Sequence, residues 1–361
     1  MRTTRRFTRW MAALAGAAMI GVAGAAAGLE TIRLTMSSSH PTSVPWVGAL
    51  KTHVIAESNK RLEAAKSNYR IQWNEAFGGV LYNFNNTLEP VAQGVTDMGW
   101  VGALWEPAKL PLQNIMFATP FVTSDEEIAV DVMNKLTDTI PAMKAEWTRH
   151  NLVYLGATVS DTYHLFTKFP IRSLDDLKGK KIVAGTAHAV WLKAVGATPV
   201  SAGLPAYYQM LQTGVADGTL IISTGAHSFK LYEVAPFITL VDLGVTTIGG
   251  LAVNGDTWKR LPPDVRDVLA KLGREYSTVH AREVKARVKG SIDAMVAAGS
   301  KISTLSVADR QRWIDAMGNV SKEFVAANSA RGVPAADIVK TFMTEMRARG
   351  AKPLRNWDEG L

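Results

Sequence analysis

The sequence contains no cysteine among its 361 residues. Disulfide bonds, thiol catalysis and thiolate metal sites are therefore excluded, and so is a lipid anchor on an N-terminal cysteine. The chain must be stabilised by burial of a hydrophobic core, which its length permits. Beyond the N-terminus no segment approaches the roughly 18 consecutive apolar residues of a membrane-spanning helix. These absences favour a soluble protein with two lobes, each with its own core.

The sequence also lacks the short motifs of the common enzyme classes. It has no G-x-S-x-G elbow, no H-E-x-x-H pair, no G-x-x-x-x-G-K phosphate loop and no G-x-G-x-x-G turn. The seven histidines are scattered and lack the spacing that brings metal ligands together on a helix. Asp175 and Asp176 are paired carboxylates, but their place before a Leu-Lys-Gly sequence is typical of a helix cap. We therefore expect no catalytic residues, no metal and no cofactor.

Basic residues exceed acidic ones by 40 to 32, but the excess is concentrated at the N-terminus. Residues 1–27 contain four arginines and no acidic residue, which leaves 36 basic and 32 acidic residues for the remainder. This mild charge, without clustered basic stripes, predicts no nucleic-acid partner.

The first 27 residues have the order of a secretory signal peptide. Basic residues end at Arg9, an apolar run covers residues 10–22, and small residues fill positions 23–28. We predict cleavage after Ala25 or Ala27 and a periplasmic mature protein. The alternative, a membrane anchor, is disfavoured because an apolar run of roughly 13 to 18 residues rich in Ala and Gly is short for a span.

The remaining chain alternates strands and helices before becoming helical. The patterns predict strands over residues 30–36, 69–73, 97–101, 181–183 and 198–200, and helices over 44–65, 83–93, 189–195 and 206–213. This alternation predicts α/β architecture with parallel sheets. Further helices are expected over residues 262–297, 306–327 and 334–347, each after a Pro or Ser start signal. The sequence QGVTD at 93–97 is echoed by QTGVAD at 212–217, which indicates two similar lobes.

Aromatic residues gather in the first part of the chain, where Trp46, Trp73, Trp100 and Trp105 fall within sixty residues. Core packing explains part of this group. Trp100 and Trp105, however, follow the carboxyl end of a predicted strand, where open α/β sheets place ligands. A flat apolar wall with one polar group suits a small-molecule pocket, and for Trp105 both interpretations stay open.

Four ordered segments of the second half carry a family resemblance: LDDLKGKKI at 174–182, GATPV at 196–200, YQMLQTGVADG at 208–218 and FKLYEV at 229–234. Earlier segments agree, namely SHP at 39–41, GGVLY at 78–82 and DMGW at 97–100. The series resembles the solute-binding subunits of tripartite ATP-independent periplasmic (TRAP) transporters, of the C4-dicarboxylate-binding type. The resemblance covers residues 30 to 345.

The resemblance implies a two-lobed periplasmic solute-binding protein fold, with a ligand cleft between the lobes and a long helix spanning both. Lobe I is expected over residues 28–155 with a return segment at about 240–285. Lobe II is expected over 156–239 with C-terminal helices at about 286–361. Closure around a ligand would present a surface to the large and small membrane subunits.

The ligand site that the resemblance implies is built from strand ends of both lobes. From the first lobe it draws His40, Phe77, Gly78, Tyr82, Trp100 and Trp105. From the second it draws Tyr163, His164, Thr186, Trp191, Ser223 and Thr224. For each of these residues the alternative is packing in the cleft wall or the scaffold.

One departure from the family pattern bears on the ligand. The family usually has an arginine after the LKGKKI run that pairs with the ligand carboxylate, and here Val183 stands there; a second arginine is replaced by Tyr163. Loss of such a pair removes about 1.5–3 kcal/mol per charge-assisted hydrogen bond. Either another cation replaces it or the ligand is larger and less polar than a dicarboxylate. The candidate replacements are Lys168, Arg172, Lys193 and His164.

The sequence thus predicts a receptor, not an enzyme, which captures a small organic solute and delivers it to TRAP membrane subunits. An organic acid with an aromatic or alicyclic body fits the apolar substitutions. Two alternatives remain at this point: a solute-binding sensor that acts with a signalling partner, and an exported α/β enzyme.

Overall fold

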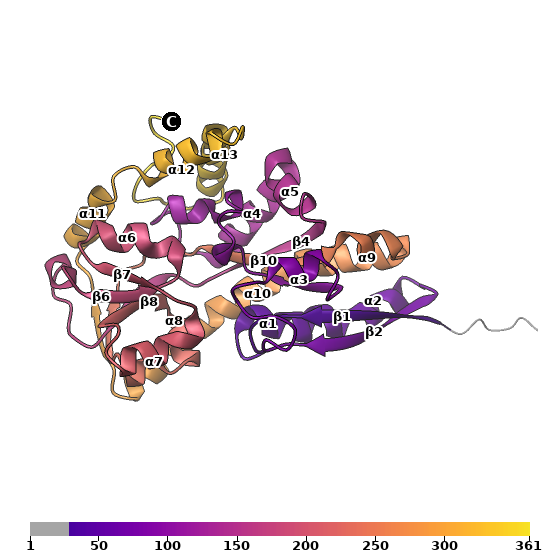
Figure 1. Cartoon of the computed structure of the whole chain (residues 1–361), viewed down its shortest axis with the longest axis horizontal. Helices are drawn as coiled ribbons and strands as arrows, with labels where there is room; N and C mark the ends of the chain where they lie inside the picture. Colours follow the sequence, from indigo (N-terminus) through magenta and orange to yellow (C-terminus); the bar gives the residue numbers. More distant parts are fainter. Residues whose placement is uncertain (1–28) are drawn as a thin grey trace, which may run out of the picture.

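The computed structural model describes residues 29–361. The predicted signal peptide, residues 1–27, lies outside the described residues. Within the described part, no helix combines the length and the apolar character needed to cross a membrane. The strands form two separate sheets, which Figure 1 shows side by side, and each sheet with its helices forms one lobe.

Lobe I is built on a five-stranded sheet. In spatial order its strands are β2 (Tyr69–Ala76), β1 (Glu30–Ser37), β3 (Met98–Val101), β10 (Thr247–Asn254) and β4 (Leu152–Val159). Its helices are α1 (Pro45–Ala49), α2 (Ala56–Ala64), α3 (Leu88–Ala92), α4 (Glu126–Thr139), α5 (Pro141–Thr148) and α9 (Gly255–Arg260). A π-helical segment, Leu50–Ile55, joins α1 to α2, so the helix predicted over 44–65 is present as one continuous helical stretch.

Lobe II is built on a six-stranded sheet. Its strands, in spatial order, are β11 (Lys301–Thr304), β9 (Phe237–Leu240), β5 (Tyr163–Thr167), β8 (Gly218–Ile222), β6 (Lys181–Ala184) and β7 (Thr198–Ser201). Its helices are α6 (Ala189–Ala194), α7 (Tyr207–Gln212) and α8 (Ser223–Ser228). Strands β6 and β7 and helices α6 and α7 agree with the strands and helices that the sequence predicts for this region.

Both sheets are mixed, whereas the alternation of strands and helices predicted parallel sheets. In lobe I, β10 runs antiparallel to β3 and β4, and in lobe II, β5 runs antiparallel to β8 and β9. Each of these strands is the first after the chain has crossed from the other lobe. Because the crossing segments enter from the cleft side, β5 and β10 run away from the cleft while their neighbours run toward it.

The two crossing segments, residues 160–162 and 241–246, are hydrogen-bonded to each other. The backbone nitrogen of Ser160 donates to the carbonyl of Thr246 (2.9 Å), and the Thr246 nitrogen donates to Ser160 Oγ (3.1 Å). The Gly244 nitrogen donates to Thr162 Oγ1 (3.0 Å). This pair of segments forms the connection about which the lobes can move relative to each other.

The long helix predicted from residue 262 is α10 (Pro263–Ala297), 35 residues that contact both lobes. It packs against β4 and α4 in lobe I and against α8 in lobe II. Two glycines permit the approach to β4, because a Cβ on Gly156 would overlap the carbonyl of Gly273 and a Cβ on Gly273 would lie 2.5 Å from Leu155 Cβ. The predicted spanning helix is thereby confirmed.

Three helices end the chain: α11 (Val307–Ala316), α12 (Val320–Ser329) and α13 (Ala335–Ala348). The single helix predicted over 306–327 is therefore wrong. The helix breaks because Gly318 takes a left-handed conformation (φ 61°) and the Asn319 side chain caps α12 by accepting from the Lys322 nitrogen. The helix predicted over 83–93 is also too long, since only α3 forms there. The loop before α3 instead lies at the cleft.

The C-terminal helices touch both lobes. In α11, Trp313 Nε1 donates to the carbonyl of Trp191 in α6 (2.9 Å). On the other side α13 lies against α4, where Lys135 pairs with Glu345 (2.7 Å). Figure 1 shows α12 and α13 above α4. The residue boundaries predicted for the lobes stay predictions.

Candidate functional site

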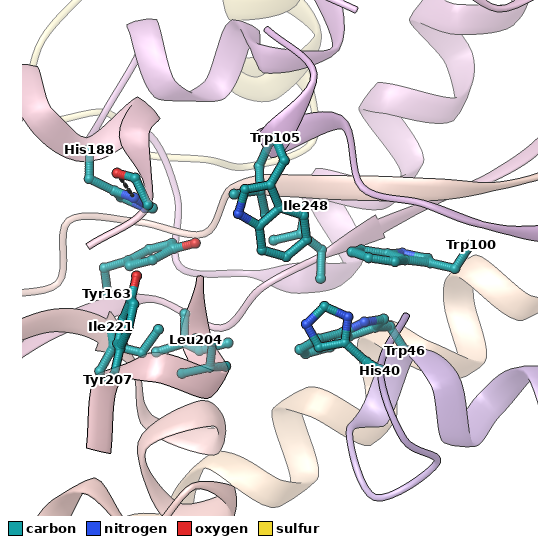
Figure 2. A pocket seen from close by; sticks show the side chains of 13 residues that line it. His40, Trp46, Trp100, Trp105, Tyr163, His188, Leu204, Tyr207, Ile221 and Ile248 are labelled. Atoms are coloured by element: carbon teal, nitrogen blue, oxygen red, sulfur yellow. Dashed lines mark hydrogen bonds between the residues drawn. The ribbon is translucent and has the colours of Figure 1, made fainter. Parts of the chain in front are cut away.

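A cavity lies between the two lobes (Figure 2). Its wall combines residues from the ends of β1 and β3 with residues from the ends of β6 and β8 and the start of β5. The lining residues are His40, Trp46, Trp100, Leu104, Trp105, Tyr163, Gly185, His188, Leu204, Tyr207, Ile221, Ile222 and Ile248.

The lobe I wall of the cavity is an aromatic cluster. The ring of His40 stacks on Trp105 (centroids 5.5 Å apart, planes 18° apart) and meets the edges of Trp46 and Trp100 at 5.5 and 5.4 Å. Trp100 and Trp105 meet edge to face at 5.8 Å. Such geometries are favourable for aromatic pairs, so the four rings hold one another in place.

Hydrogen bonds of its backbone and its ring fix the position of His40. The turn after β1 places Ser38 Oγ 3.2 Å from the His40 nitrogen and Ser39 Oγ 2.9 Å from His40 Nδ1. The carbonyl of His40 accepts from the nitrogen of Gly78 (2.9 Å), and Gly78 takes a positive φ of 77° that side chains disfavour. Gly78 therefore supports His40 through the backbone.

Trp100 and Trp105 are positioned by small and polar neighbours. Trp100 Nε1 donates to Thr158 Oγ1 of β4 (2.8 Å), and the Trp100 carbonyl accepts from the Tyr82 hydroxyl (3.2 Å). Between the two tryptophans stands Gly102, where a Cβ would lie 2.5 Å from the Trp105 ring and 2.9 Å from that of Trp100. Only glycine lets both rings turn toward the cleft.

The lobe II wall centres on His188, which ends the short 3-10 turn Thr186–His188 after β6. Its ring lies 4.4 Å from Tyr163 and 5.1 Å from Trp191 and Phe117, measured between centroids. His188 Nδ1 is 3.1 Å from the carbonyl of Gly185. In Figure 2 the hydroxyl end of Tyr163 points toward the space between the walls.

The cavity wall carries no charged side chain at neutral pH. Its residues include no Lys, Arg, Asp or Glu. Burial lowers the pKa of both His40 and His188 to about 4, because each ring is removed from water and has no anionic partner. Burial also raises the pKa of Tyr163 to about 12, so this phenol is neutral. A ligand in this cavity meets aromatic faces and neutral hydrogen-bonding groups.

Four polar nitrogens of the wall have no hydrogen-bond partner within the described residues: His40 Nε2, Trp46 Nε1, Trp105 Nε1 and His188 Nε2. A buried polar group left unpaired costs about 1–3 kcal/mol. Water or a ligand in the cavity could supply the missing partners. The cavity therefore has the composition of a small-molecule site, apolar with a few convergent polar atoms.

The structure brings four of the twelve predicted site residues to the cavity wall: His40, Trp100, Trp105 and Tyr163. Four others lie close behind it. Gly78 and Tyr82 support His40 and Trp100 as described. Trp191 lies behind His188 and donates from Nε1 to the carbonyl of Phe117 (2.9 Å). Thr224 donates to the buried Asp161 (2.6 Å).

The remaining four predicted residues lie off the wall. Phe77 is half-buried beside the turn at Gly78, and Thr186 is exposed. His164 follows Tyr163 on β5, so its side chain points to the opposite face of the sheet, where Nδ1 accepts from the Val241 nitrogen (3.2 Å). Ser223 is buried at the start of α8 without lining the cavity.

No cation replaces the family arginine at the wall. Val183 is fully buried in β6 and does not line the cavity. Lys168, Arg172 and Lys193 are exposed. The buried His164 faces Asp242, 3.8 Å from Nε2 to Oδ1. Among the described residues, the candidate replacements for the arginine therefore lie outside the cavity.

Sequence reasoning missed nine lining residues: Trp46, Leu104, Gly185, His188, Leu204, Tyr207, Ile221, Ile222 and Ile248. Several of them stand in the first turn after a strand. Trp46 begins the helix after β1, His188 follows β6, and Leu204 and Tyr207 follow β7. A search of every turn that follows a predicted strand end would have found these four.

Two α/β lobes joined by paired crossing segments, with one cavity at their strand ends and a helix along both, define the two-lobed class of periplasmic binding proteins. The model of bacterial extracellular solute-binding protein family 7 (DctP) matches residues 47–328. The chain belongs to this family, and the resemblance read from its motifs is confirmed.

Individual relatives agree with this assignment. The C4-dicarboxylate-binding periplasmic protein DctP of Shewanella loihica is 28% identical over 216 residues, 58% of this chain and 62% of that protein. The matched segments span about half to three fifths of the first curated relatives. A TRAP periplasmic solute-binding protein of Desulfovibrio salexigens is 27% identical, with a TM-score of 0.75 over 89% of this chain and 97% of that one.

A second solved structure shares the fold at lower identity. It is a marine-metagenome TRAP solute-binding protein specific for aromatic acid ligands, in complex with 3-hydroxybenzoate. It is 22% identical, with a TM-score of 0.79 over 89% of this chain and 99% of that one.

Proposed function

We propose that the protein is an extracytoplasmic receptor that captures a monocarboxylate with an aromatic or alicyclic body and delivers it to the large and small membrane subunits of a TRAP transporter. The observation that carries this proposal is the cavity wall, which consists of aromatic and aliphatic side chains and neutral histidines without a cation. The solute class of the marine-metagenome relative supports the same choice.

The argument for a single charge is energetic. A dicarboxylate entering a closed cleft loses the hydration of two charges and requires fixed cations in return. The unpartnered nitrogens of Trp46 and Trp105 offer hydrogen bonds for one carboxylate but no compensating charge. A ring buried against the tryptophans, in contrast, contributes about 25 cal/mol per Å² of apolar surface removed from water. The wall therefore favours one carboxylate on an apolar body.

The receptor performs no chemistry on its ligand in this proposal. The polar residues around the cavity make structural hydrogen bonds: Tyr82 to Trp100, Trp191 to Phe117, and Thr224 to Asp161. None of these contacts pairs a nucleophile with a base at the cavity wall. A solute recovered chemically unchanged after incubation with the protein supports this part, and turnover contradicts it.

Export by the N-terminal signal completes the proposal. Cleavage after Ala25 or Ala27 leaves the mature chain starting near Ala26 or Gly28, just before β1. Intact-mass measurement of protein from the periplasmic fraction is expected to show the loss of these residues. Recovery of the full-length chain in the inner membrane contradicts it.

Mass spectrometry of ligand released from freshly purified, denatured protein tests the proposed solute class. We expect an organic acid with one carboxylate and a ring. A co-purified succinate or malate contradicts the proposal. The Trp105→Ala variant provides the control, because loss of one wall of the cavity is expected to reduce the amount of retained ligand.

A further inference from the structure

Two buried histidines reach the cavity from opposite lobes, and each has an unpartnered Nε2. His40 belongs to the turn after β1 and His188 to the turn after β6. Figure 2 shows them on opposite sides of the space, with Trp105 above and between them. The partner of Nδ1 differs between the two rings, and this partner determines whether Nε2 donates a hydrogen bond to a bound carboxylate or accepts one. The inference below rests on the proposed function.

The tautomer of His188 follows from its partner. Nδ1 lies 3.1 Å from the carbonyl oxygen of Gly185, and a carbonyl oxygen can only accept a hydrogen bond. Nδ1 therefore carries the hydrogen. In the neutral ring Nε2 then has a lone pair and no hydrogen, so His188 is an acceptor toward the cavity.

His40 is free to take the opposite role. Its Nδ1 lies 2.9 Å from the hydroxyl of Ser39, which can donate as well as accept. With Ser39 as the donor, Nε2 of His40 carries the hydrogen and donates to a ligand oxygen. Trp105 Nε1, a donor only, is unpartnered in the same wall. Lobe I thus supplies donors, whereas His188 in lobe II supplies a lone pair.

The groups around the two histidines leave them uncharged. His188 faces Phe117, Trp191 and Tyr163, of which only Tyr163 titrates, and its pKa is raised to about 12 by burial. His40 faces Trp46, Trp100, Trp105 and Ser39, none of which titrates. Behind Tyr163 lies Asp161, which is bonded to Thr224 and whose pKa burial raises to about 6. No cation of the described residues faces either ring.

A carboxylate oxygen placed against the Nε2 lone pair of His188 is repelled unless a proton lies between them. We propose that the receptor takes up one proton with each monocarboxylate, held between a carboxylate oxygen and Nε2 of His188. The proton comes from the solvent, and no other bond forms or breaks. The pair of His188 and the carboxyl group then has no net charge, either as imidazole with carboxylic acid or as imidazolium with carboxylate.

Proton uptake makes affinity depend on pH in a defined direction. Between pH 7 and 8 a free carboxylic acid is ionised, and free His188, whose pKa is about 4, is unprotonated. Binding then requires one proton, so the dissociation constant for benzoate falls about tenfold for each unit by which the pH falls.

Calorimetry of benzoate binding in buffers of different ionisation enthalpy measures the number of protons directly. Benzoate is the probe because the carboxylate is its only polar group. We expect uptake of about one proton per benzoate at pH 7.5. In His188→Gln the side-chain amide donates to the carboxylate, so binding persists, uptake falls to zero and the affinity becomes independent of pH between 7 and 8.

Two further variants serve as controls. His227 is half-buried outside the cavity, and His227→Gln is expected to retain full proton uptake. His40→Gln is expected to weaken binding while retaining uptake, because His40 acts as a donor. Loss of uptake in His40→Gln together with full uptake in His188→Gln overturns the assignment of the proton to His188.

The outcomes separate this inference from the proposed function. Benzoate bound by the unmodified chain with no proton uptake overturns the inference and leaves the proposed function intact. If neither benzoate nor any other ring-bearing acid binds, both fail. The measurement on the unmodified chain decides the inference even if His188→Gln does not fold.

Discussion

Trp105 stands where the aromatic cluster of lobe I meets the cavity. It stacks on His40, meets Trp100 edge to face and lies 5.7 Å from the ring of Phe84, and it remains half-buried with a free Nε1. A ligand ring in the cavity would cover its remaining surface. Replacing Trp105 should therefore reduce the affinity for the ligand more than the free energy of unfolding.

Trp105→Ala is expected to weaken the binding of benzoate at least tenfold. Covering a large apolar side chain contributes about 1.5–3 kcal/mol, which corresponds to roughly 10- to 150-fold in affinity. Calorimetry of the variant measures this. The matched control is Trp258→Ala in α9, a half-buried tryptophan that does not line the cavity. Equal affinities of Trp105→Ala and the unmodified chain would place Trp105 in the scaffold.

At this scale the sequence predicts the lobe I wall better than the lobe II wall. Trp100 and Trp105 are recognisable because they follow a strand end in a segment rich in aromatics. His188 is not recognisable in this way, because the spacing of residues does not reveal the contact between its Nδ1 and the carbonyl of Gly185. Alternation along β5 places Tyr163 at the cavity and His164 on the other face, but the sequence does not indicate which of the two faces the cleft.

At the scale of elements, the loop before α3 and the turn after β7 meet across the cleft. Gly203 has ordinary extended backbone angles (φ −86°, ψ 149°), yet a Cβ there would overlap the ring of Phe84 from lobe I. Phe84 in turn packs on Trp105. Glycine at this position thus permits the lobes to close over the aromatic wall.

Gly203→Ala is expected to weaken benzoate binding about tenfold without changing the stability of the free protein. The added methyl group creates an overlap of the kind that costs about 1–3 kcal/mol, and we expect this contact only when the lobes are closed over the ligand. Small-angle scattering should show a smaller ligand-induced decrease in radius of gyration for the variant. Restored closure in Gly203→Ala/Phe84→Ala would confirm the cause, and unchanged affinity in the single variant would contradict it.

A second close approach, between α10 and β4, concerns stability rather than binding. Gly273→Val is expected to lower the free energy of unfolding by about 1–3 kcal/mol, because the side chain would meet Leu155 Cβ at 2.5 Å. Urea denaturation measures this. The control in the same helix is Gly290→Ala, where a Cβ has nothing within 4 Å. Similar stability of both variants would show that the helix shifts without cost.

Most of the helices and strands that the sequence analysis names are present in the structure, and the failures among them have local causes. The 35-residue α10 was predicted nearly to the residue because two prolines begin it and its pattern is continuous. The break at Gly318 was missed because a glycine within a helical pattern can equally be accommodated inside the helix. The antiparallel direction of β5 and β10 is not predicted, because it depends on the route of the chain between the lobes, which strand patterns do not encode.

At the scale of the whole molecule, a cleft whose wall carries no cation should select ligands that have few charges and a large apolar body. The cleft retains the family architecture, with two sheets, paired crossing segments and a spanning helix. The cavity wall carries no charged side chain, and Val183, which stands where the resemblance implies an arginine, is buried in β6 outside the wall. Selectivity should therefore differ from that of a dicarboxylate receptor, although the fold is the same.

A thermal-shift panel on the mature chain tests this claim most directly. The panel compares succinate, malate and fumarate with benzoate, 3-hydroxybenzoate and cyclohexanecarboxylate at matched concentrations and pH. We predict stabilisation by at least one of the ring-bearing acids, worth about 2.7 kcal/mol at a hundredfold excess over the dissociation constant. The dicarboxylates should cause little or no shift. Strong stabilisation by succinate with no response to any ring-bearing acid would contradict the account.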